Sequence, residues 1–390
     1  MKKINLKSFI AGVLITVLVM TLITTVMATQ AKNTINATYR DIKITIDGEE
    51  ITPRDAEGNF VEPFISGNNT FLPVRAVANA VGYDVDWDDK TSTVSLTKKP
   101  PAMITIKGAE YSTDLTELEL VDMGLTSADI EPLRYMTNLT RLDLSYNKIS
   151  DISTLKGLTK LERLYLIDNE ISDISVLKNL TNLSSLSLNG NQVTDINALN
   201  GLANLEYLDL VNNEISDISA LSNLTNLEEL GLRENQISDI SALSSMTKLR
   251  VLSLGVNQIS DISSLSGLTD LTWLTLEMNQ QIKDISALKN LTNLTYLGMF
   301  SNPISNINAL KGLTNLEHLY LSDNQISDIS ALKGLTNLVS MTLTNNQISD
   351  INALKDLSNL QYLSLTGNPL TEAQIAELQE ALPNCKINFN

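Results

Sequence analysis

Leucines and isoleucines recur along most of the chain with a period of about 22 residues, which indicates one supersecondary unit stacked many times. In the first clear copy, residues 139–147, the sequence L-T-R-L-D-L-S-Y-N has leucine at the first, fourth and sixth positions and asparagine at the ninth. The asparagines that close the copies are Asn147, Asn169, Asn191, Asn213, Asn235, Asn257, Asn279, Asn302, Asn324, Asn346 and Asn368.

Each copy divides into a strand and a return segment. The L-x-L pair alternates apolar and polar positions, which predicts a short strand with its leucines in the core. The following I-S-D-I-S-x-L-x-x-L half is too short and too weakly periodic for a long helix, so we expect a turn or a short 3₁₀ segment. We expect the closing asparagine to be a buried amide that satisfies backbone groups of its own coil and of the adjacent one.

These repeats resemble those of the internalin-type leucine-rich repeat proteins, because the unit N-x-I-S-D-I-S-A-L-x-G-L-T-N-L is close to the repeat of that family. The resemblance covers residues 115 to 390 and implies a curved leucine-rich repeat solenoid. Its parallel β-sheet would line the concave side, with turns and 3₁₀ segments on the convex side. The implied solenoid runs over residues 100–370.

Both ends of the solenoid depart from the repeat, as terminal repeats do when one face has no neighbour. Leu118 and Leu120 belong to an imperfect first repeat, in which Met123 replaces the asparagine. At the other end, Thr371 is the expected N-cap of a helix that stops before Pro383. Residues 371–390 resemble the C-terminal cap of such solenoids. There we expect Cys385 to be a buried core residue rather than a reactive thiol, since free cysteines are usually buried.

The region before the repeats alternates apolar and polar residues in several short stretches. Residues 42–46 precede an Asp47-Gly48 turn signal, residues 76–81 have a short helical pattern, and residues 84–87 and 93–96 predict two further strands. Together they predict a small α+β domain over residues 39–99.

Residues 39–98 resemble the copper amine oxidase N-terminal-like domain of secreted bacterial proteins, through L-P-V-R-A-V-A followed by G-Y-x-V-x-W. The span contains no His, Cys or Met, so it offers no copper ligands of those types. The resemblance implies an extracellular stalk or a module associated with the cell wall.

The chain begins with basic residues, Lys2, Lys3 and Lys7, and an apolar run follows to Ala28. This arrangement, with small residues before the end of the run, predicts a signal peptide over residues 1–28. An uncleaved membrane anchor of similar length is the alternative. Residues 29–38 are polar and predict a linker. With either outcome we expect the remainder to be exported, either secreted or held at the cell surface.

The formal net charge of −17 disfavours nucleic acid and anionic membranes as partners, since neither attracts a polyanion. A membrane association is expected only if the N-terminal apolar run stays attached. Cys385 is the only cysteine, so no intrachain disulfide and no C-x-x-C metal motif exists.

The variable positions of the strand half, which are the second, third, fifth, seventh and eighth, lie on or beside the open face of the predicted sheet. All eight aromatic residues between positions 139 and 368 occupy them. They suggest a binding surface, because aromatic and Arg residues are enriched at binding hot spots. The alternative is that they pack against cross-strand neighbours. The candidate ligand-binding residues are Tyr207, Arg233, Trp273, Met278, Tyr296, Phe300, His318, Tyr320 and Tyr362.

The period slips once beside these candidates, because Asn279 and Asn302 are one residue further apart than the other neighbouring asparagines, and Gln280-Gln281 doubles a single Gln. The slip is either a tolerated loop insertion or a bulge that shapes the rim of the face. Neighbouring carboxylates such as Glu229 and Glu277, balanced by Arg233, are expected to form a solvated face.

Catalytic and metal-binding patterns find little support. One His without a nearby Cys leaves no standard nucleophilic pair, and G-x-S-x-G, H-E-x-x-H and P-loop motifs are absent. The recurrent Asp of S-D-I-S supplies one carboxylate per repeat, whereas calcium needs clustered oxygens, so we expect it to cap the turn. We therefore expect no enzyme activity, no metal and no cofactor.

These observations predict an exported binding or adhesion protein that recognises a protein or glycan partner through the concave face of its repeats. The alternative is a spacer associated with the envelope, which the N-terminal module attaches to the cell wall. An extracellular hydrolase is a third, distant interpretation, because the sequence lacks the catalytic constellation that it would need.

Overall fold

The computed structural model describes residues 102–389 throughout and, before them, seven short strands and Ala78. The chain divides into two compact units, Met1–Pro101 and Ala102–Asn390, and each is treated by itself. Among the described residues, no helix has the length and apolar character that crossing a bilayer requires.

The described part of the first unit consists of short antiparallel pairs. β2 and β3 flank the predicted Asp47-Gly48 turn, and β6 pairs with β7 over the two strands predicted there. Ala78, inside the predicted helix, is helical and buried, and Thr38 of the predicted linker belongs to β1. The predicted signal peptide lies outside the described residues, and the α+β class of this unit stays a prediction. The strands are β1 (Thr38–Tyr39), β2 (Ile44–Ile46), β3 (Glu49–Ile51), β4 (Phe64–Ser66), β5 (Asn69–Phe71), β6 (Tyr83–Asp88) and β7 (Thr93–Lys98).

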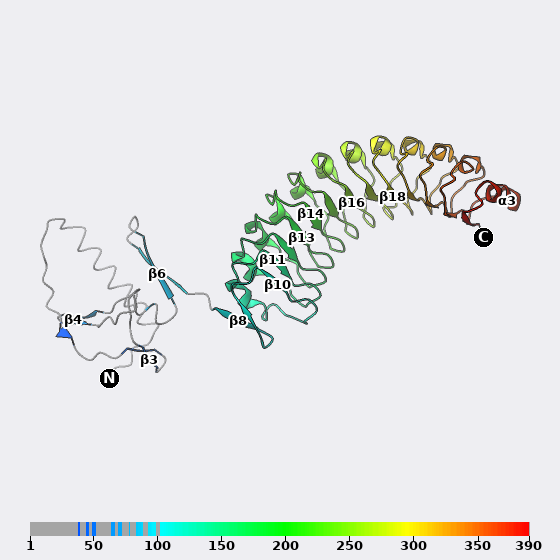
Figure 1. The fold of residues 1–390 in the computed structure, drawn as a ribbon. Coiled ribbons are helices and arrows are strands. Elements are labelled where there is room, and N and C mark those ends of the chain that lie inside the picture. Colours follow the sequence, from blue (N-terminus) through cyan, green and yellow to red (C-terminus); the bar gives the residue numbers. More distant parts are fainter. Residues whose placement is uncertain are drawn as a thin grey trace. The chain divides into compact units, whose positions relative to one another are not determined.

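The second unit is a solenoid whose 13 strands form one parallel sheet along the inner side of an arc (Figure 1). Each strand pairs with the next one along the chain, so that Arg141 lies opposite Arg163, one period later. The predicted leucine-rich repeat fold is confirmed. The strands are β10 (Glu117–Glu119), β11 (Arg141–Asp143), β12 (Arg163–Tyr165), β13 (Ser185–Ser187), β14 (Tyr207–Asp209), β15 (Glu229–Gly231), β16 (Val251–Ser253), β17 (Trp273–Thr275), β18 (Tyr296–Gly298), β19 (His318–Tyr320), β20 (Ser340–Thr342), β21 (Tyr362–Ser364) and β22 (Lys386–Asn388).

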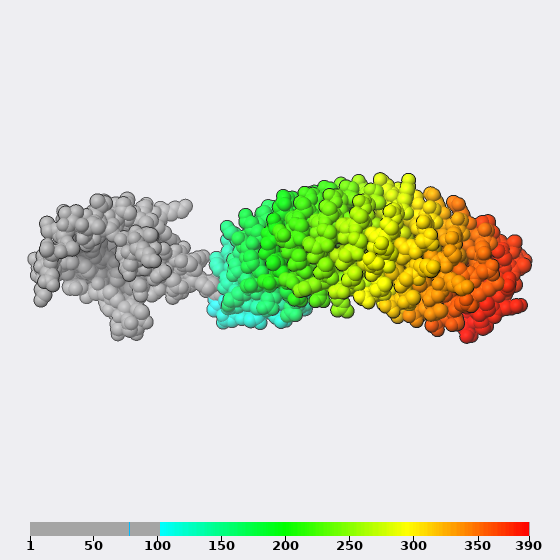
Figure 2. Space-filling model, turned by 90° about the horizontal axis from the view of Figure 1, so that it is seen from above, coloured from blue at the N-terminus to red at the C-terminus, as the bar shows by residue number. Residues whose placement is uncertain are grey.

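The outer side of the arc carries short 3₁₀ helices, as predicted for the return segments (Figure 1). In the space-filling view the coils follow one another in chain order as successive colour bands (Figure 2). The 3₁₀ helices are η1 (Glu131–Tyr135), η2 (Ser153–Gly157), η3 (Ser175–Asn179), η4 (Asn197–Leu199), η5 (Ser219–Leu221), η6 (Ser241–Ser245), η7 (Ser263–Gly267), η8 (Ser286–Asn290), η9 (Asn308–Leu310), η10 (Ser330–Leu332) and η11 (Asn352–Leu354).

Aspartates begin the return segments by local hydrogen bonds. In η7, the Ser263 amide donates to the Asp261 carboxylate at 2.8 Å, and this bond holds the pKa of Asp261 below its usual value. The same bond recurs in the other repeats that have this Asp, and in one repeat Asn306 takes the place of the Asp and accepts the equivalent bond. The predicted capping role is confirmed.

The core is a continuous stack of leucine and isoleucine side chains between the strands and the 3₁₀ helices. Leu139, Leu142 and Leu144 of the strand half and Ile149 and Ile152 of the return half are all buried, and later repeats bury the same positions. A single coil cannot cover this apolar surface alone, so each coil depends on its neighbours for stability.

The asparagines form a ladder of buried amides between neighbouring coils. Asn257 donates from Nδ2 to the carbonyl oxygens of Leu232, Leu254 and Gly255 at 2.9, 3.1 and 3.2 Å. Its Oδ1 accepts from the Ile237 amide at 3.0 Å. Each ladder asparagine thus satisfies backbone groups of its own coil and the preceding one, which is the role predicted from the sequence.

The ladder is interrupted where the period slips. Asn302 keeps its donated bonds, but its buried Oδ1 accepts no hydrogen bond from any described residue. The extra residue, Gln280, has a left-handed φ of 60°. The insertion therefore shifts the amide of the preceding coil out of line with Asn302. A shallow depression of about 270 Å³ lies beside it, lined by residues that include Gln280 and Pro303.

Both ends of the solenoid are closed. The hairpin of β8 (Met103–Ile106) and β9 (Ala109–Ser112) adds Ile104 and Ile106 to the core beside the first coil. At the other end, α3 (Glu372–Ala381) begins at Thr371, which forms a capping box with Gln374. Cys385 is buried, and burial raises the pKa of its thiol, in agreement with the prediction of a core residue.

Candidate ligand-binding face

The concave face is made by the third, fifth and seventh positions of each strand half, because these alternate with the buried leucines. Parallel pairing without offset brings equivalent positions of successive repeats side by side. A long side chain on this face therefore contacts the repeat before or after it more readily than its own neighbours in sequence.

Four rings from three successive strands form an aromatic cluster, consisting of Trp273, Tyr296, His318 and Tyr320. Trp273 and Tyr296 stack face to face, with ring centroids 3.5 Å apart and planes inclined by 6°. Tyr296 also contacts His318 and Tyr320, with centroids 6.0 and 5.3 Å away in tilted arrangements. Trp273 remains 40% exposed. The structure thus brings these four predicted residues together on the concave face.

The remaining apolar and aromatic candidates lie outside this cluster. Met278 is 40% exposed at the end of the coil that contains Trp273, and its amide donates to the Phe300 carbonyl at 2.9 Å. Tyr207 lies on β14, three strands before β17. Tyr362 lies on β21, where its hydroxyl accepts from Asn388 at 3.0 Å. Met278 and Phe300 border the cluster, whereas Tyr207 and Tyr362 are separate from it.

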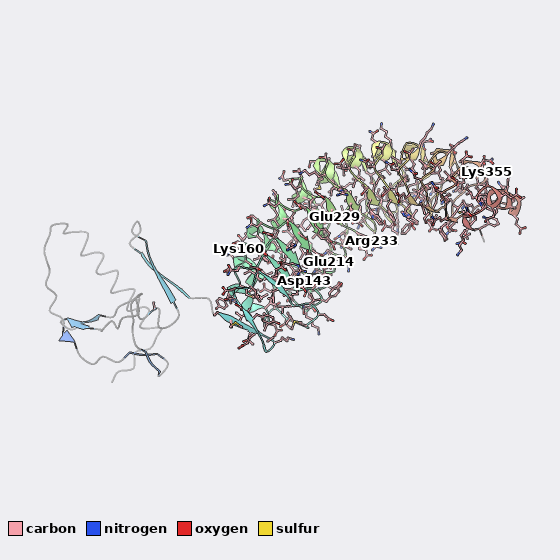
Figure 3. The ribbon with its side chains drawn as sticks, in the orientation of Figure 1. Asp143, Lys160, Glu214, Glu229, Arg233 and Lys355 are labelled. Atoms are coloured by element: carbon pink, nitrogen blue, oxygen red, sulfur yellow. The ribbon has the colours of Figure 1, made fainter. Side chains whose placement is uncertain are left out.

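Arg233 is held by carboxylates rather than free on the surface. It lies after β15, in the same coil as Glu229 (Figure 3). Its Nε donates to Glu277 Oε1 at 3.0 Å, two repeats away, and its Nη1 pairs with Glu234. Arg233 therefore orients Glu277.

The expectation that Glu277 is solvated is wrong, because its side chain is buried and only 6% of its surface is exposed. Gly255 occupies the equivalent position one repeat earlier, and a Cβ there would lie 2.2 Å from the Glu277 carboxylate. The carboxylate therefore fills the space that Gly255 leaves open. Glu277 was absent from the candidates predicted from the sequence, although a Glu one period after a Gly was the available signal.

Two tyrosines on this face stay neutral well above physiological pH. Burial raises the pKa of Tyr207 to about 12, with the carboxylates of Asp209 and Glu229 adding to the effect. Burial also raises the pKa of Tyr296, assisted by Tyr320 and Glu277. Their hydroxyl groups are therefore hydrogen-bond donors for a ligand at neutral pH.

Family models agree with this architecture. A model of two leucine-rich repeats matches the chain in overlapping pairs between residues 137 and 356. An internalin (InlF) from Listeria monocytogenes is 38% identical, with 73% of this chain and 85% of that chain aligned and a TM-score of 0.68. The chain belongs to the internalin-like leucine-rich repeat proteins. No curated protein matches it.

Two further structures are similar to this internalin-like protein. The ectodomain of the plant receptor kinase GASSHO1/SCHENGEN3 from Arabidopsis thaliana is 25% identical, with 71% of this chain and 35% of that chain aligned and a TM-score of 0.62. InlJ from Listeria monocytogenes is 21% identical, with 72% and 64% aligned and a TM-score of 0.60, and shares the fold.

The region before the repeats matches the copper amine oxidase N-terminal domain over residues 54–122. This match begins and ends later than the span of residues 39–98 that shows the resemblance in sequence, and it includes the β8–β9 hairpin. It concerns the N-terminal domain of those enzymes. Among residues 102–389, no group of three or more metal-ligating side chains is found.

Proposed function

We propose that this internalin-like protein is exported and binds a protein ligand through the concave face of its repeats, with the aromatic cluster at the centre of the contact. The observation that carries the proposal is the stacked Trp273–Tyr296 pair, which is partly exposed on the concave face. Such apolar surface favours a partner that removes it from water.

The stacked pair is also suited to binding because it is already ordered. Trp273 and Tyr296 hold each other in one arrangement, so a ligand does not have to immobilise two free side chains. Large aromatic residues at the centre of an interface supply a disproportionate share of the binding energy. Met278 and Phe300 lie further along the coils of Trp273 and Tyr296 and add partly exposed apolar side chains.

A protein ligand is favoured over a glycan by the relatives. The GASSHO1/SCHENGEN3 ectodomain was solved in complex with Casparian strip integrity factor 2. Export is supported by the basic residues and apolar run of residues 1–28. A surface or secreted location is consistent with a long binding face on a protein of net charge −17.

A photo-crosslinking amino acid at position 251, which lies opposite Trp273 on the neighbouring strand and leaves both stacked rings in place, tests the proposal. The protein would be applied to intact bacterial and animal cell surfaces, with position 289 on the convex helix η8 as the matched control. We expect a discrete crosslinked product from position 251 only. Protease treatment of the surface should abolish it and glycosidase treatment should not. Equal crosslinking from both positions would contradict binding by the concave face.

A second candidate function is a spacer that attaches to the cell wall through the N-terminal module. The match of residues 54–122 to a domain outside the repeats supports it. Cosedimentation of the full chain and of a chain lacking residues 29–99 with purified cell wall distinguishes the two. Wall binding that needs residues 29–99, together with no crosslinked partner from position 251, would favour the spacer.

A further inference from the structure

The two carboxylate oxygens of Glu277 have different surroundings. Oε1 accepts the hydrogen bond from Arg233 Nε at 3.0 Å. Oε2 is buried and accepts no hydrogen bond from any described residue. A buried carboxylate oxygen without a donor is costly, since charged groups removed from water need hydrogen-bond partners. The carboxylate is therefore held in place through Oε1, while Oε2 lacks a hydrogen-bond donor.

Two glycines border this carboxylate. Gly255 lies under the carboxylate, and Gly298 lies on the far side from Arg233. A Cβ at position 298 would lie 4.0 Å from Glu277 Oε2 and 3.6 Å from Cε1 of Tyr296. Oε2 and the Tyr296 ring thus both lie beside Gly298 on the floor of the concave face.

The surroundings favour a cation over an anion. Near Arg233 the concave face and its edge carry Asp209, Glu228, Glu229 and Glu234, and the formal charge of the whole chain is −17. The exposed faces of Trp and Tyr rings attract ammonium and guanidinium groups. A carboxylate oxygen beside a stacked aromatic pair therefore presents two features that recognise a cation together.

We propose that Glu277 and the stacked Trp273–Tyr296 pair form a subsite for a lysine or arginine side chain of the protein ligand. This inference rests on the proposed function and specifies the chemistry of its contact. The cationic group donates to Glu277 Oε2 and lies against the aromatic pair. Because Oε2 is buried in the free protein, its cover shifts to admit the cation while the aromatic stack is retained.

Arg233 positions the Glu277 carboxylate in this arrangement. Its bond to Oε1 fixes the carboxylate over Gly255, so that Oε2 points away from Arg233. A ligand cation then completes the hydrogen bonding of a carboxylate that is already desolvated and oriented. Such preorganisation reduces the cost of binding.

The test uses small cations on the purified full chain. The probes are N-acetyl-arginine methylamide, N-acetyl-lysine methylamide and the neutral N-acetyl-citrulline methylamide, which has nearly the shape of the arginine probe. The chain has two tryptophans, so a Trp87→Phe background leaves Trp273 as the only indole N–H signal in an NMR titration. We expect saturable shifts with the arginine and lysine probes. Binding of the citrulline probe should be about tenfold weaker or more.

Three variants make the result specific. Glu277→Gln removes the charge, and Gly255→Ala keeps it but displaces the carboxylate, because the added Cβ would lie 2.2 Å from it. Glu117→Gln, on β10 at the far end of the same sheet, removes one arginine-paired charge as a matched control. We expect the first two to weaken cation binding about tenfold or more and the control to leave it unchanged. The unfolding transition of each variant verifies that it is folded.

Equal binding of the arginine and citrulline probes, or unchanged binding in both Glu277→Gln and Gly255→Ala, would overturn the subsite. That failure is separate from failure of the proposed function. A partner crosslinked from position 251 without cation binding would mean that the concave face binds by other chemistry. Cation binding without a crosslinked partner would support the subsite but contradict the proposed function.

Discussion

Deleting Gln280 should stabilise the protein, which is unusual for a deletion inside a folded domain. The deletion turns Asn279-Gln280-Gln281-Ile282 into the Asn-Gln-Ile sequence that Asn257-Gln258-Ile259 has in the preceding repeat. The regular period is then restored on both sides. We expect the Ile282 amide to come into line with Asn302 Oδ1, as Ile259 does with Asn279 Oδ1 at 3.0 Å.

Two terms contribute to the expected gain. Satisfying the buried Oδ1 of Asn302 is worth about 1–3 kcal/mol, the cost of leaving such an acceptor unpaired. Removing a non-glycine residue at a φ of 60° relieves strain of about 1–2 kcal/mol. Together they predict an increase in the free energy of unfolding of about 2–5 kcal/mol. At roughly 2–4 °C per kcal/mol for a large domain, the melting temperature should rise by several degrees.

Urea unfolding combined with hydrogen exchange measures this effect and locates it. Because coils contact only their neighbours, increased protection should be confined to the coils around residues 276–304. Deletion of Gln258 is the matched control, since it makes a regular repeat one residue too short and should destabilise. If the Gln280 deletion were neutral or destabilising, the unpaired Oδ1 of Asn302 would not be a consequence of the insertion.

Three further predictions concern single side chains. Asn257→Ala removes three donated hydrogen bonds and one accepted bond, so it should lower the free energy of unfolding by about 3 kcal/mol in a denaturant titration. Asn302→Ala should lower it by about 1 kcal/mol less, because the Oδ1 of Asn302 is already unpaired. Equal losses in the two variants would contradict the role given to the asparagine ladder. Val256 is β-branched at a φ of 55°, so Val256→Asn should raise the free energy of unfolding by about 1 kcal/mol, and a loss would show that its packing outweighs the strain. The folded-state pKa of Tyr207, about 12, lies above the value of 10 for the unfolded chain, so its contribution to stability is complete below pH 10 and is lost as pH rises towards 12. Tyr207→Phe should therefore lose less stability between pH 9 and 11 than the unaltered protein, and an identical loss would contradict this assignment.

The fold of the repeats was predictable because one chemical requirement recurs in every coil. The regular leucine spacing fixes the strand positions, and register follows from the period, so the neighbours of Tyr296 on the sheet could be named from the sequence. The ladder asparagines were predictable for the same reason, since each must satisfy the same backbone groups.

The side-chain arrangement of the site was less predictable because it depends on contacts between repeats. The position of Glu277 is determined by Gly255, one repeat away, and Arg233, two repeats away. The expectation that Glu277 is solvated was wrong because it considered each repeat by itself. The face-to-face stacking of Trp273 on Tyr296 likewise depends on ring orientation, which periodicity does not specify. Their equivalent positions in successive repeats predicted that Trp273 and Tyr296 are neighbours, but not the geometry of their contact.

The most direct test of the account is the effect of the aromatic pair on binding. The double variant Trp273→Ala with Tyr296→Ala should be compared with Tyr146→Ala with Tyr165→Ala, which removes two rings from earlier repeats outside the cluster. Binding to the surface identified by crosslinking from position 251 would be measured at equal folded-protein concentration. We predict that the first variant weakens binding about 100-fold, as loss of two hot-spot residues would, and that the second changes it little. Unchanged binding in the first variant would contradict recognition by the concave aromatic cluster.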